Sequence, residues 1–229
     1  MRKCGTVAVA LVLASSAVHA QTITSGFTFT VASGGGACAT GTHYHSNTGG
    51  AFGNPAGKAE VGNYSSECVR GLSEYNLAGL SSATNAFVTF DVFKLGGLFS
   101  GTNDFPFSGT IDVFAYGGNN LEDISDYQAA SLGMVGSFST IGLGVGEILS
   151  LDITSFFNTA VAASQSSLGI RLQRSGESST ASGAETFQNF RLTSDNQSTG
   201  VVPEPSTYAL TAAGLGAIAY LRRRRRVVA

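Results

Sequence analysis

Two histidines, His43 and His45, lie one residue apart and are candidate metal ligands. On a strand, this spacing would place both imidazole rings on one face of the sheet. Two imidazoles can begin a zinc or copper site, which needs one or two further ligands nearby. The other histidine, His19, lies in an N-terminal segment that we expect to be removed, and the residues around His43 are rich in Gly, Thr and Asn. We therefore expect a loop at this position and no metal site.

Two cysteines, Cys38 and Cys68, remain once that N-terminal segment is removed. In an oxidising compartment outside the cytoplasm, an isolated pair of cysteines most often forms a disulfide bond. We predict this bond between Cys38 and Cys68. Free thiols, or a thiolate metal site shared with His43 and His45, are the alternatives.

Three carboxylates, those of Glu122, Asp123 and Asp126, follow a run of Gly and Asn residues. Oxygen-rich loops of this kind can hold Ca²⁺, but the spacing here is not that of a calcium-binding loop. We expect a solvated acidic loop, with a structural calcium site as the alternative.

The chain lacks the usual sequence patterns of hydrolases and nucleotide-binding enzymes. A Ser-His-acid triad would have to use His43 or His45, and no Gly-x-Ser-x-Gly elbow is present. The glycines are scattered among predicted turns and do not form a phosphate-binding loop. Three arginines in the last part of the middle domain, Arg171, Arg174 and Arg191, are expected to face solvent or to pair with acids. We predict no catalytic residue and no cofactor.

Glycan binding usually depends on exposed aromatic side chains, on which the faces of sugar rings stack. The chain has no Trp, so this role would fall to tyrosines in predicted loops or at strand ends, namely Tyr44, Tyr64, Tyr116 and Tyr127. Together with loop hydroxyls and amides, they would give only weak binding of a polysaccharide. The alternative is a domain that binds nothing and acts as a spacer or coat.

The composition indicates an all-β domain. With 30 Gly and only 12% charged residues among 229, the chain is unlike a coiled coil or a helical bundle, and 43% hydrophobic residues can support a packed core. Short apolar or alternating runs recur between segments rich in Gly, Ser, Asn and Asp. They predict strands at 22–31, 69–77, 86–95, 110–116, 135–141, 148–153, 168–173 and 186–193, and one helix at 155–163 capped by Asp152 or Thr154. Eight or nine such strands favour a single antiparallel β-sandwich.

The distribution of charge argues against a nucleic-acid partner. All 15 acidic residues lie between residues 60 and 204, whereas only six of the 13 basic residues lie between the two basic ends of the chain. A surface of this sign repels phosphate groups. We expect no nucleic acid to bind.

The N-terminus has the three parts of a secretory signal peptide. Arg2 and Lys3 supply positive charge, a short apolar run follows, and Val18-His19-Ala20 places small residues at the positions that a signal peptidase inspects. Cleavage between Ala20 and Gln21 is predicted, so that residues 1–20 form the signal peptide. A retained membrane anchor is the alternative, but the apolar run is short for a membrane span.

The C-terminus also has three parts. Pro203, Glu204, Pro205 and Ser206 precede an apolar stretch from Thr207 to Leu221 and five arginines, Arg222, Arg223, Arg224, Arg225 and Arg226. The prolines cannot continue a helix, so they keep the triplet extended and open to an enzyme. A helix of the apolar stretch would be a short membrane span, and the arginines mark its cytoplasmic side. A permanent tail anchor is one interpretation of this layout.

This layout resembles the PEP-CTERM sorting tail of Gram-negative bacteria. The resemblance implies recognition by an exosortase, a membrane-embedded processing enzyme that is thought to cleave near the triplet. It also implies transient residence in the inner membrane, followed by the cell surface or an extracellular, often exopolysaccharide, matrix. The resemblance covers about 25 residues and implies nothing about the remainder.

Two stretches of the middle domain resemble DNRLRE-type domains of secreted bacterial proteins. The first begins at Val69-Arg70-Gly71 and ends at Leu80, with Tyr75 and Asn76 where that group has Phe-Asp. The second is Leu151-Asp152-Ile153-Thr154, a helical turn, and Leu168-Gly169-Ile170-Arg171-Leu172. The resemblance implies a jelly-roll-like sandwich related in shape to carbohydrate-binding modules.

These features predict a non-enzymatic exported protein, with weak glycan binding as an additional expectation. The domains are a signal peptide at 1–20, a β-sandwich at 21–197, a linker with the Pro-Glu-Pro motif at 198–206, a transmembrane sorting helix at 207–221 and a basic cytoplasmic tail at 222–229. The alternatives are a secreted carbohydrate-active hydrolase and a membrane-tethered adhesin with the same tail.

Overall fold

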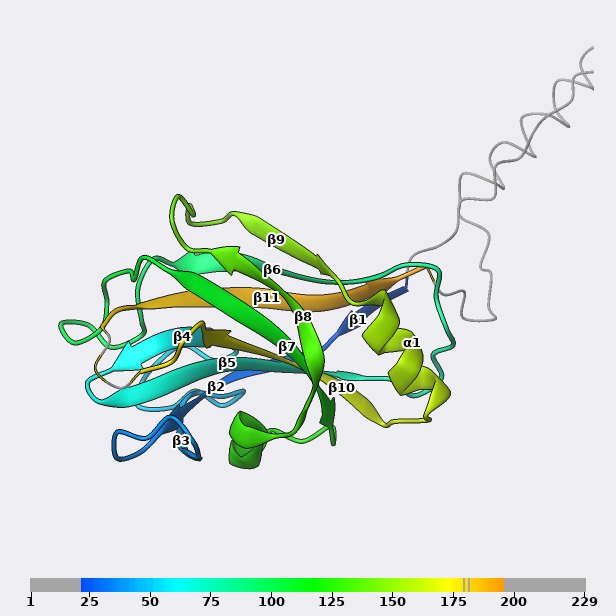
Figure 1. The fold of residues 1–229 in the computed structure, drawn as a ribbon, viewed down its shortest axis with the longest axis horizontal. Helices are drawn as coiled ribbons and strands as arrows, with labels where there is room; N and C mark the ends of the chain where they lie inside the picture. The colour runs from blue at the N-terminus through cyan, green and yellow to red at the C-terminus, as the bar shows by residue number, and fades with distance from the viewer. Residues whose placement is uncertain (1–21, 179, 181, 196–229) are drawn as a thin grey trace, which may run out of the picture.

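A computed structural model of the protein describes residues 22–178, 180 and 182–195 (Figure 1). These residues form β-strands, one α-helix and one 3₁₀ helix, α1 (Thr154–Ala162) and η1 (Ile124–Gln128). The strands are β1 (Thr22–Ser25), β2 (Phe27–Ser33), β3 (Gly41–Ser46), β4 (Ala59–Tyr64), β5 (Glu67–Asn76), β6 (Ala86–Lys94), β7 (Thr110–Gly118), β8 (Ser131–Ser139), β9 (Ile148–Asp152), β10 (Ser167–Arg174) and β11 (Ala184–Ser194). The predicted all-β class is confirmed. The strand predicted at 22–31 is divided into β1 and β2, and the other predicted strands and the predicted helix are found close to their expected bounds.

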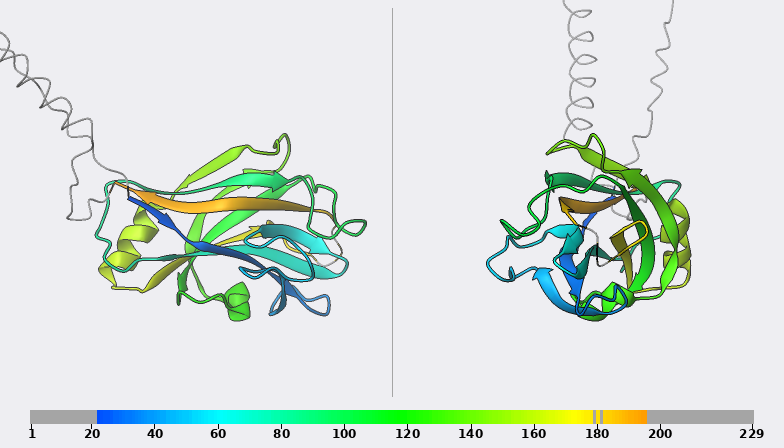
Figure 2. Two further views of the ribbon diagram at one scale, coloured as in Figure 1. Left: turned by 180° about the vertical axis from the view of Figure 1, so that it is seen from behind. Right: turned by 60° about the vertical axis from the view of Figure 1, so that its left-hand side comes forward.

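The strands form one antiparallel sheet that folds over on itself. Its main order is β8-β7-β10-β5-β4-β11-β6-β9, with β2 on the other side of β5, β3 beyond β2, and β1 beside β11. The edge strands β8 and β9 contact each other, so the sheet is nearly closed around its core, as the end-on view in Figure 2 shows. The predicted sandwich is therefore confirmed, with its two layers continuous through β4.

The main core lies between the two layers and follows the alternation in the sequence. Val88, Phe90 and Val92 of β6 are fully buried, while the residues between them are partly exposed. The ring of Phe90 stacks on Phe190 at 4.5 Å and meets Phe187 edge-on at 5.4 Å. Successive side chains of a strand point to opposite faces, which is why the pattern in the sequence located this core.

Helix α1 covers one end of the core through Phe157 and Ala160, which are both buried. Its N-cap is Ile153, which makes no side-chain capping bond, so the predicted capping by Asp152 or Thr154 is wrong. The apolar side chain of Ile153 is fully buried in the core and has no group that could accept a hydrogen bond from the first turn of the helix. The carboxylate of Asp152 still accepts a hydrogen bond from the amide of Thr154, at 2.8 Å.

Strands β3 and β4 were not predicted, because several of their buried residues are polar. His45 and Ser46 of β3 and Glu60 and Asn63 of β4 are all almost completely buried. Polar residues in such positions need hydrogen-bond partners, and these come from other parts of the chain. A search for apolar alternation cannot find strands of this kind.

The two stretches that resemble DNRLRE-type domains lie on neighbouring strands. The first falls on β5, and the second runs through β9, α1 and β10. Strands β5 and β10 pair directly, with Leu72 opposite Arg171. The resemblance itself remains an expectation.

The two ends of the domain lie side by side, because Thr22 of β1 pairs with Ser194 of β11. In Figure 1 both lie at the right-hand end, whereas β3 and the β4–β5 hairpin lie toward the opposite end. The signal-peptide site at Ala20 and Gln21, the Pro-Glu-Pro triplet with Ser206, the apolar stretch at 207–221 and the arginine cluster all lie outside the described residues. Within the described residues, no helix has the length and apolar character to cross a membrane.

Candidate functional site

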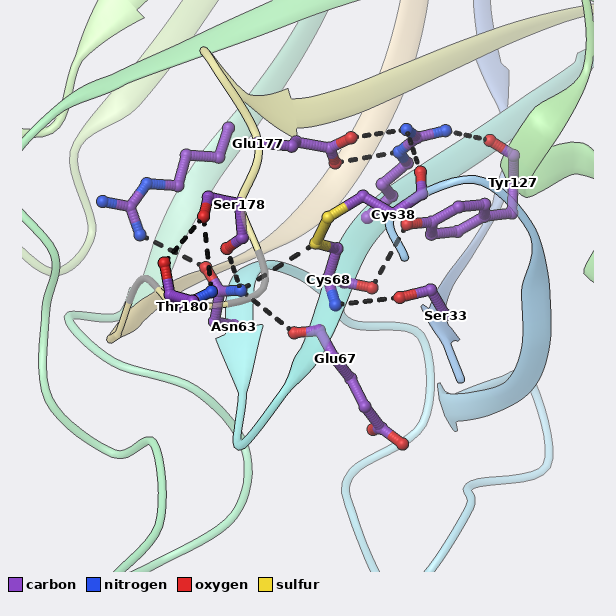
Figure 3. The surroundings of a disulfide bond; sticks show 11 residues. Ser33, Cys38, Asn63, Glu67, Cys68, Tyr127, Glu177, Ser178 and Thr180 are labelled. Carbon is purple, nitrogen blue, oxygen red and sulfur yellow. Dashed lines mark hydrogen bonds and ion pairs between the residues drawn. A yellow bond between two sulfur atoms is a disulfide. The ribbon is translucent and has the colours of Figure 1, made fainter. Parts of the chain in front are cut away.

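The predicted disulfide is present. Cys38, in the loop after β2, is bonded to Cys68 of β5, and their Cα atoms are 5.2 Å apart (Figure 3). The amide of Cys68 donates to the hydroxyl of Ser33 at 3.0 Å, which fixes β5 against the end of β2. Because both sulfur atoms are used in this bond, the free thiols and the thiolate metal site are excluded in this structure.

A buried ion pair lies next to the disulfide. Arg70 of β5 forms a two-point contact with Glu177, in the loop after β10, with Nε 2.9 Å from Oε1. The guanidinium also donates to the carbonyls of Tyr127 and Cys38 and lies 4.0 Å from the centre of the Tyr127 ring. Burial lowers the pKa of Arg70, but the hydrogen bond and charge of Glu177 outweigh it and raise the pKa above its usual value. The pair therefore holds three separate segments together and is structural.

Arg171 differs from the expectation that it would face solvent or pair with an acid. It is buried, and its Nη1 donates to three backbone carbonyls, those of Asp126, Tyr127 and Ala129. These carbonyls surround the end of η1, so Arg171 anchors this segment on the outer face of β10. Burial and the neighbouring charge of Arg70 lower the pKa of Arg171. Arg174 and Arg191 instead donate to Asn63 and Thr89.

The three carboxylates of the acidic loop do not converge on one point. Glu122 accepts hydrogen bonds from the amide and the hydroxyl of Thr48, and Asp123 accepts from the amide of Ser125 at the start of η1. Asp126 is buried, which contradicts the prediction of a solvated loop. Burial, together with the charge of the neighbouring Glu74, raises the pKa of its carboxyl to about 7.

The tyrosines expected to contact sugars are mostly unavailable for that role. Tyr116 and Tyr127 are fully buried in a second core beneath η1, which corrects the prediction. Tyr44 is partly buried and donates its hydroxyl to the carbonyl of Glu122 at 2.8 Å. Among the described residues, the exposed aromatic rings are instead those of Phe52, 73% exposed in the loop between β3 and β4, and Phe105, 44% exposed. A lone Phe among Gly and Asn residues was the signal that the sequence offered for Phe52.

An open groove lies beside the β3–β4 loop, with a volume of about 370 Å³. Its lining includes the aromatic rings of Phe27 and Phe190, the hydroxyl groups of Thr28 and Thr48 and the amide of Asn189. The exposed Ala56 also lines it. The same loop carries Phe52. Apolar walls with a few polar groups are typical of sites that bind small molecules or single sugar units.

His43 and His45 lie on β3 and not in the predicted loop. The residue between them points to the other face, and the two imidazole centres are 5.3 Å apart. Glu67, the first residue of β5, completes a group of three: its Oε2 is 3.5 Å from Nε2 of His43 and 3.4 Å from Nε2 of His45. Figure 3 shows the Glu67 side chain extending away from the disulfide. Glu67 was not predicted as a partner of the histidines, because it lies 22 residues after His45 in the sequence.

Glu60 of β4 lies behind His45. Its Oε2 is 3.0 Å from Nδ1 of His45, and both side chains are almost completely buried. The other oxygen of Glu60 accepts a hydrogen bond from the amide of Asn103. The sequence offered no signal for this contact, because Glu60 lies in an unpredicted strand.

The chain is thus an antiparallel β-domain that is followed by a tail with a Pro-Glu-Pro triplet, an apolar stretch and a cluster of arginines. Residues 201–226 match the family model of the PEP-CTERM protein-sorting motif. A search of curated proteins found no match. The motif implies export, processing by an exosortase-type membrane enzyme and sorting to the surface of a Gram-negative cell.

Proposed function

We propose that this protein is a non-enzymatic component of the cell surface or of an exopolysaccharide matrix, and that the groove beside the β3–β4 loop binds polysaccharide weakly. The PEP-CTERM motif at residues 201–226 carries the proposal, because it implies export and sorting to the cell surface. Thr22 and Ser194 are paired at the end of the domain from which the tail continues. The β3–β4 loop lies toward the other end and is free to meet extracellular polymers while the tail is still attached (Figure 1).

The surroundings of the two histidines support a non-enzymatic role. A serine protease-like triad needs a histidine within hydrogen-bond distance of a nucleophile and an acid. Among the described residues, the polar partners of His43 and His45 are Thr42, Glu60 and Glu67. The hydroxyl among these partners, that of Thr42, donates to the carbonyl of Ala32, so it accepts from His43 and does not give its proton to that ring.

The carboxylate pair of Glu74 and Asp126 also supports this role. A glycosidase needs two carboxylates that flank the bond to be cleaved. Glu74 and Asp126 are both buried, and Oε2 of Glu74 accepts hydrogen bonds from Asn119, Asn120 and Ser167. A sugar chain could not reach this pair without unfolding the loop above it.

Weak binding at the groove suits a matrix protein. Phe27 offers a partly exposed ring, and Thr48 and Asn189 offer polar groups at the rim. Many copies bound along one polymer would gain avidity through effective concentration, so each groove could be weak.

Titration of the exported protein with the exopolysaccharide of the producing cell tests the proposal. Ala56→Arg should obstruct the groove and weaken binding at least about tenfold, because the new side chain occupies the space of the sugar. Val145→Arg is the matched control, because it adds the same side chain at an exposed position outside the groove, and it should bind as the wild type does. An affinity for the polysaccharide that Ala56→Arg leaves unchanged would overturn the groove assignment. Shortening of the polymer by the purified protein would overturn the non-enzymatic role.

A further inference from the structure

We propose that His43, His45 and Glu67 bind one divalent metal ion, with Zn²⁺ as the best-suited ion. One ligand atom from each of these three residues lies within 4.8 Å of the other two, and Nε2 of each histidine is within 3.5 Å of Oε2 of Glu67. This inference goes beyond the proposed function and does not depend on polysaccharide binding.

The hydrogen bonds behind the histidines direct both Nε2 atoms toward Glu67. The hydroxyl of Thr42 donates to the carbonyl of Ala32 at 3.2 Å, so its oxygen accepts from Nδ1 of His43 at 2.9 Å. Glu60 is a carboxylate and accepts from Nδ1 of His45 at 3.0 Å. In neutral imidazoles, protons on both Nδ1 atoms leave the lone pairs on Nε2. Two nitrogen lone pairs and one carboxylate oxygen then face the same point.

Partners of this kind are typical of metal sites. A histidine that binds a metal usually donates its other ring nitrogen to a carboxylate, a carbonyl or another oxygen, which fixes its tautomer and orientation. Glu60 has this relation to His45, and it is itself held by Asn103, whose amide also donates to the carbonyl of Asn63 at 3.2 Å. The first ligands are therefore supported by a second layer of hydrogen bonds.

Burial gives an independent reason to expect a ligand. Nε2 of His45 and Oε2 of Glu67 are buried and have no hydrogen-bond partner among the described residues. Buried polar atoms without a partner are uncommon and costly, and a cation would satisfy both. The rings of Phe99 and Tyr64 pack against His45 at 4.6 and 5.3 Å and exclude water from it. The His43 side chain is 34% exposed and leaves a route for the ion.

The ligand set and its spacing favour zinc. Two imidazoles and one carboxylate suit Zn²⁺, which binds them tetrahedrally at about 2.0–2.2 Å, and neighbouring ligand atoms of such a tetrahedron are roughly 3.4 Å apart. The two separations between the nitrogens and the Glu67 oxygen are 3.5 and 3.4 Å. Three protein ligands leave the fourth position to water. Both oxygens of Glu60 are already hydrogen-bonded, to His45 and to Asn103, so Glu60 is not free to act as a base on that water. We therefore assign the metal a structural role and not a catalytic one.

A metal here would fasten β3 to the start of β5. The Cys38–Cys68 disulfide already ties the preceding loop to the residue next to Glu67. The two cross-links would hold the same edge of the sheet, one covalent and one dependent on metal. A bound ion stabilises the folded state in proportion to the logarithm of its concentration above the dissociation constant.

Calorimetric titration of the full chain with Zn²⁺ tests the proposal. The chain is purified in detergent without a histidine tag and is stripped with a chelator. We expect one Zn²⁺ per chain and a higher melting temperature with zinc. His43→Gln and Glu67→Gln should each weaken binding at least about 100-fold, and Glu60→Gln about 10- to 100-fold, the usual range for a partner behind the ligand. Co²⁺ in place of Zn²⁺ should give a tetrahedral absorption band that Glu67→Gln removes.

The matched control is Glu147→Gln, which changes an exposed carboxylate outside the group. It should bind Zn²⁺ as the wild type does. His43 is partly exposed, so its variant should fold even if His45→Gln does not, and circular dichroism of the metal-free protein checks this. Absence of zinc binding in the wild type, or binding that survives both His43→Gln and Glu67→Gln, would overturn the proposal and leave only ion pairs between protonated histidines and Glu67.

Discussion

Arg70 and Glu177 are 107 residues apart in the sequence, yet they form a two-point ion pair on the outer face of the sheet. The pair is mostly buried, with both side chains 11% exposed. Arg70 also reaches the loop of Cys38 and the backbone of Tyr127. One guanidinium thus connects the disulfide loop, η1 and the segment after β10.

Replacement of Glu177 by Gln should lower the free energy of unfolding by about 3 kcal/mol, because it leaves the charge of Arg70 buried without its counter-ion. Urea denaturation of the oxidised protein measures this. Glu147→Gln, at an exposed carboxylate, should change stability by no more than about 0.5 kcal/mol. Equal effects of the two variants would show that the ion pair contributes nothing.

Gly169 of β10 lies opposite Tyr116 of β7, and the ring of Tyr116 covers it. A Cβ atom at Gly169 would overlap this buried ring, so Gly169→Ala should destabilise the protein by roughly 1–3 kcal/mol through overpacking. Gly117→Ala is the control, because nothing lies within 4 Å of a Cβ atom there. Thermal melting of both variants makes the comparison, and an equal loss in both would contradict the packing argument.

Glu185 of β11 is buried, and neither carboxyl oxygen has a hydrogen-bond partner among the described residues. Burial raises its pKa from 4.5 to about 7. The folded state therefore holds the proton more tightly than the unfolded chain, and the stability that this proton contributes is lost as the pH rises from about 4.5 through 7.

Glu185→Gln should consequently stabilise the protein at pH 8, by on the order of 2 kcal/mol, and have little effect at pH 4. Denaturation curves at pH 4, 6 and 8 measure the difference, with Glu147→Gln as the control. Destabilisation by Glu185→Gln at pH 8 would mean that the carboxylate has a partner in solution.

The disulfide should be complete in exported protein. Thiol labelling under denaturing, non-reducing conditions is expected to find no free thiol on Cys38 or Cys68. Replacement of both by Ser should cost roughly 2–4 kcal/mol of stability, because the bond closes a loop between residues separated by 30 positions. Two labelled thiols in freshly secreted protein would reject the bond.

The exported form should begin at Gln21 and end near the Pro-Glu-Pro triplet. The motivation is the small-residue site before Gln21 together with the sorting motif at residues 201–226. Intact-mass spectrometry tests both ends, and a mature product that retains Leu221 would count against processing and favour a membrane-tethered adhesin. Replacement of Arg222 to Arg226 by Ser should impair orientation in the membrane, because it removes the positive charge on the cytoplasmic side.

The sequence by itself determined the fold class, the disulfide partners and the sorting tail. Each of these depends on local information: the alternation of Val88, Phe90 and Val92, a single pair of cysteines, and the order of segments around Pro203. In a strand with one buried face, apolar and polar residues must alternate. A sorting signal is recognised from the order of its segments along the chain. Neither feature therefore requires knowledge of residues that are distant in the sequence.

Only the tertiary structure decided which polar residues are buried and what they contact. Glu67 joins His43 and His45, Arg171 holds the backbone of η1, and Tyr116 covers Gly169. Burial of a polar group is tolerated only where its partners are in place, and these partners come from strands that are far apart in the sequence. A residue type at one position therefore cannot reveal whether it faces solvent, a salt bridge or a metal ion.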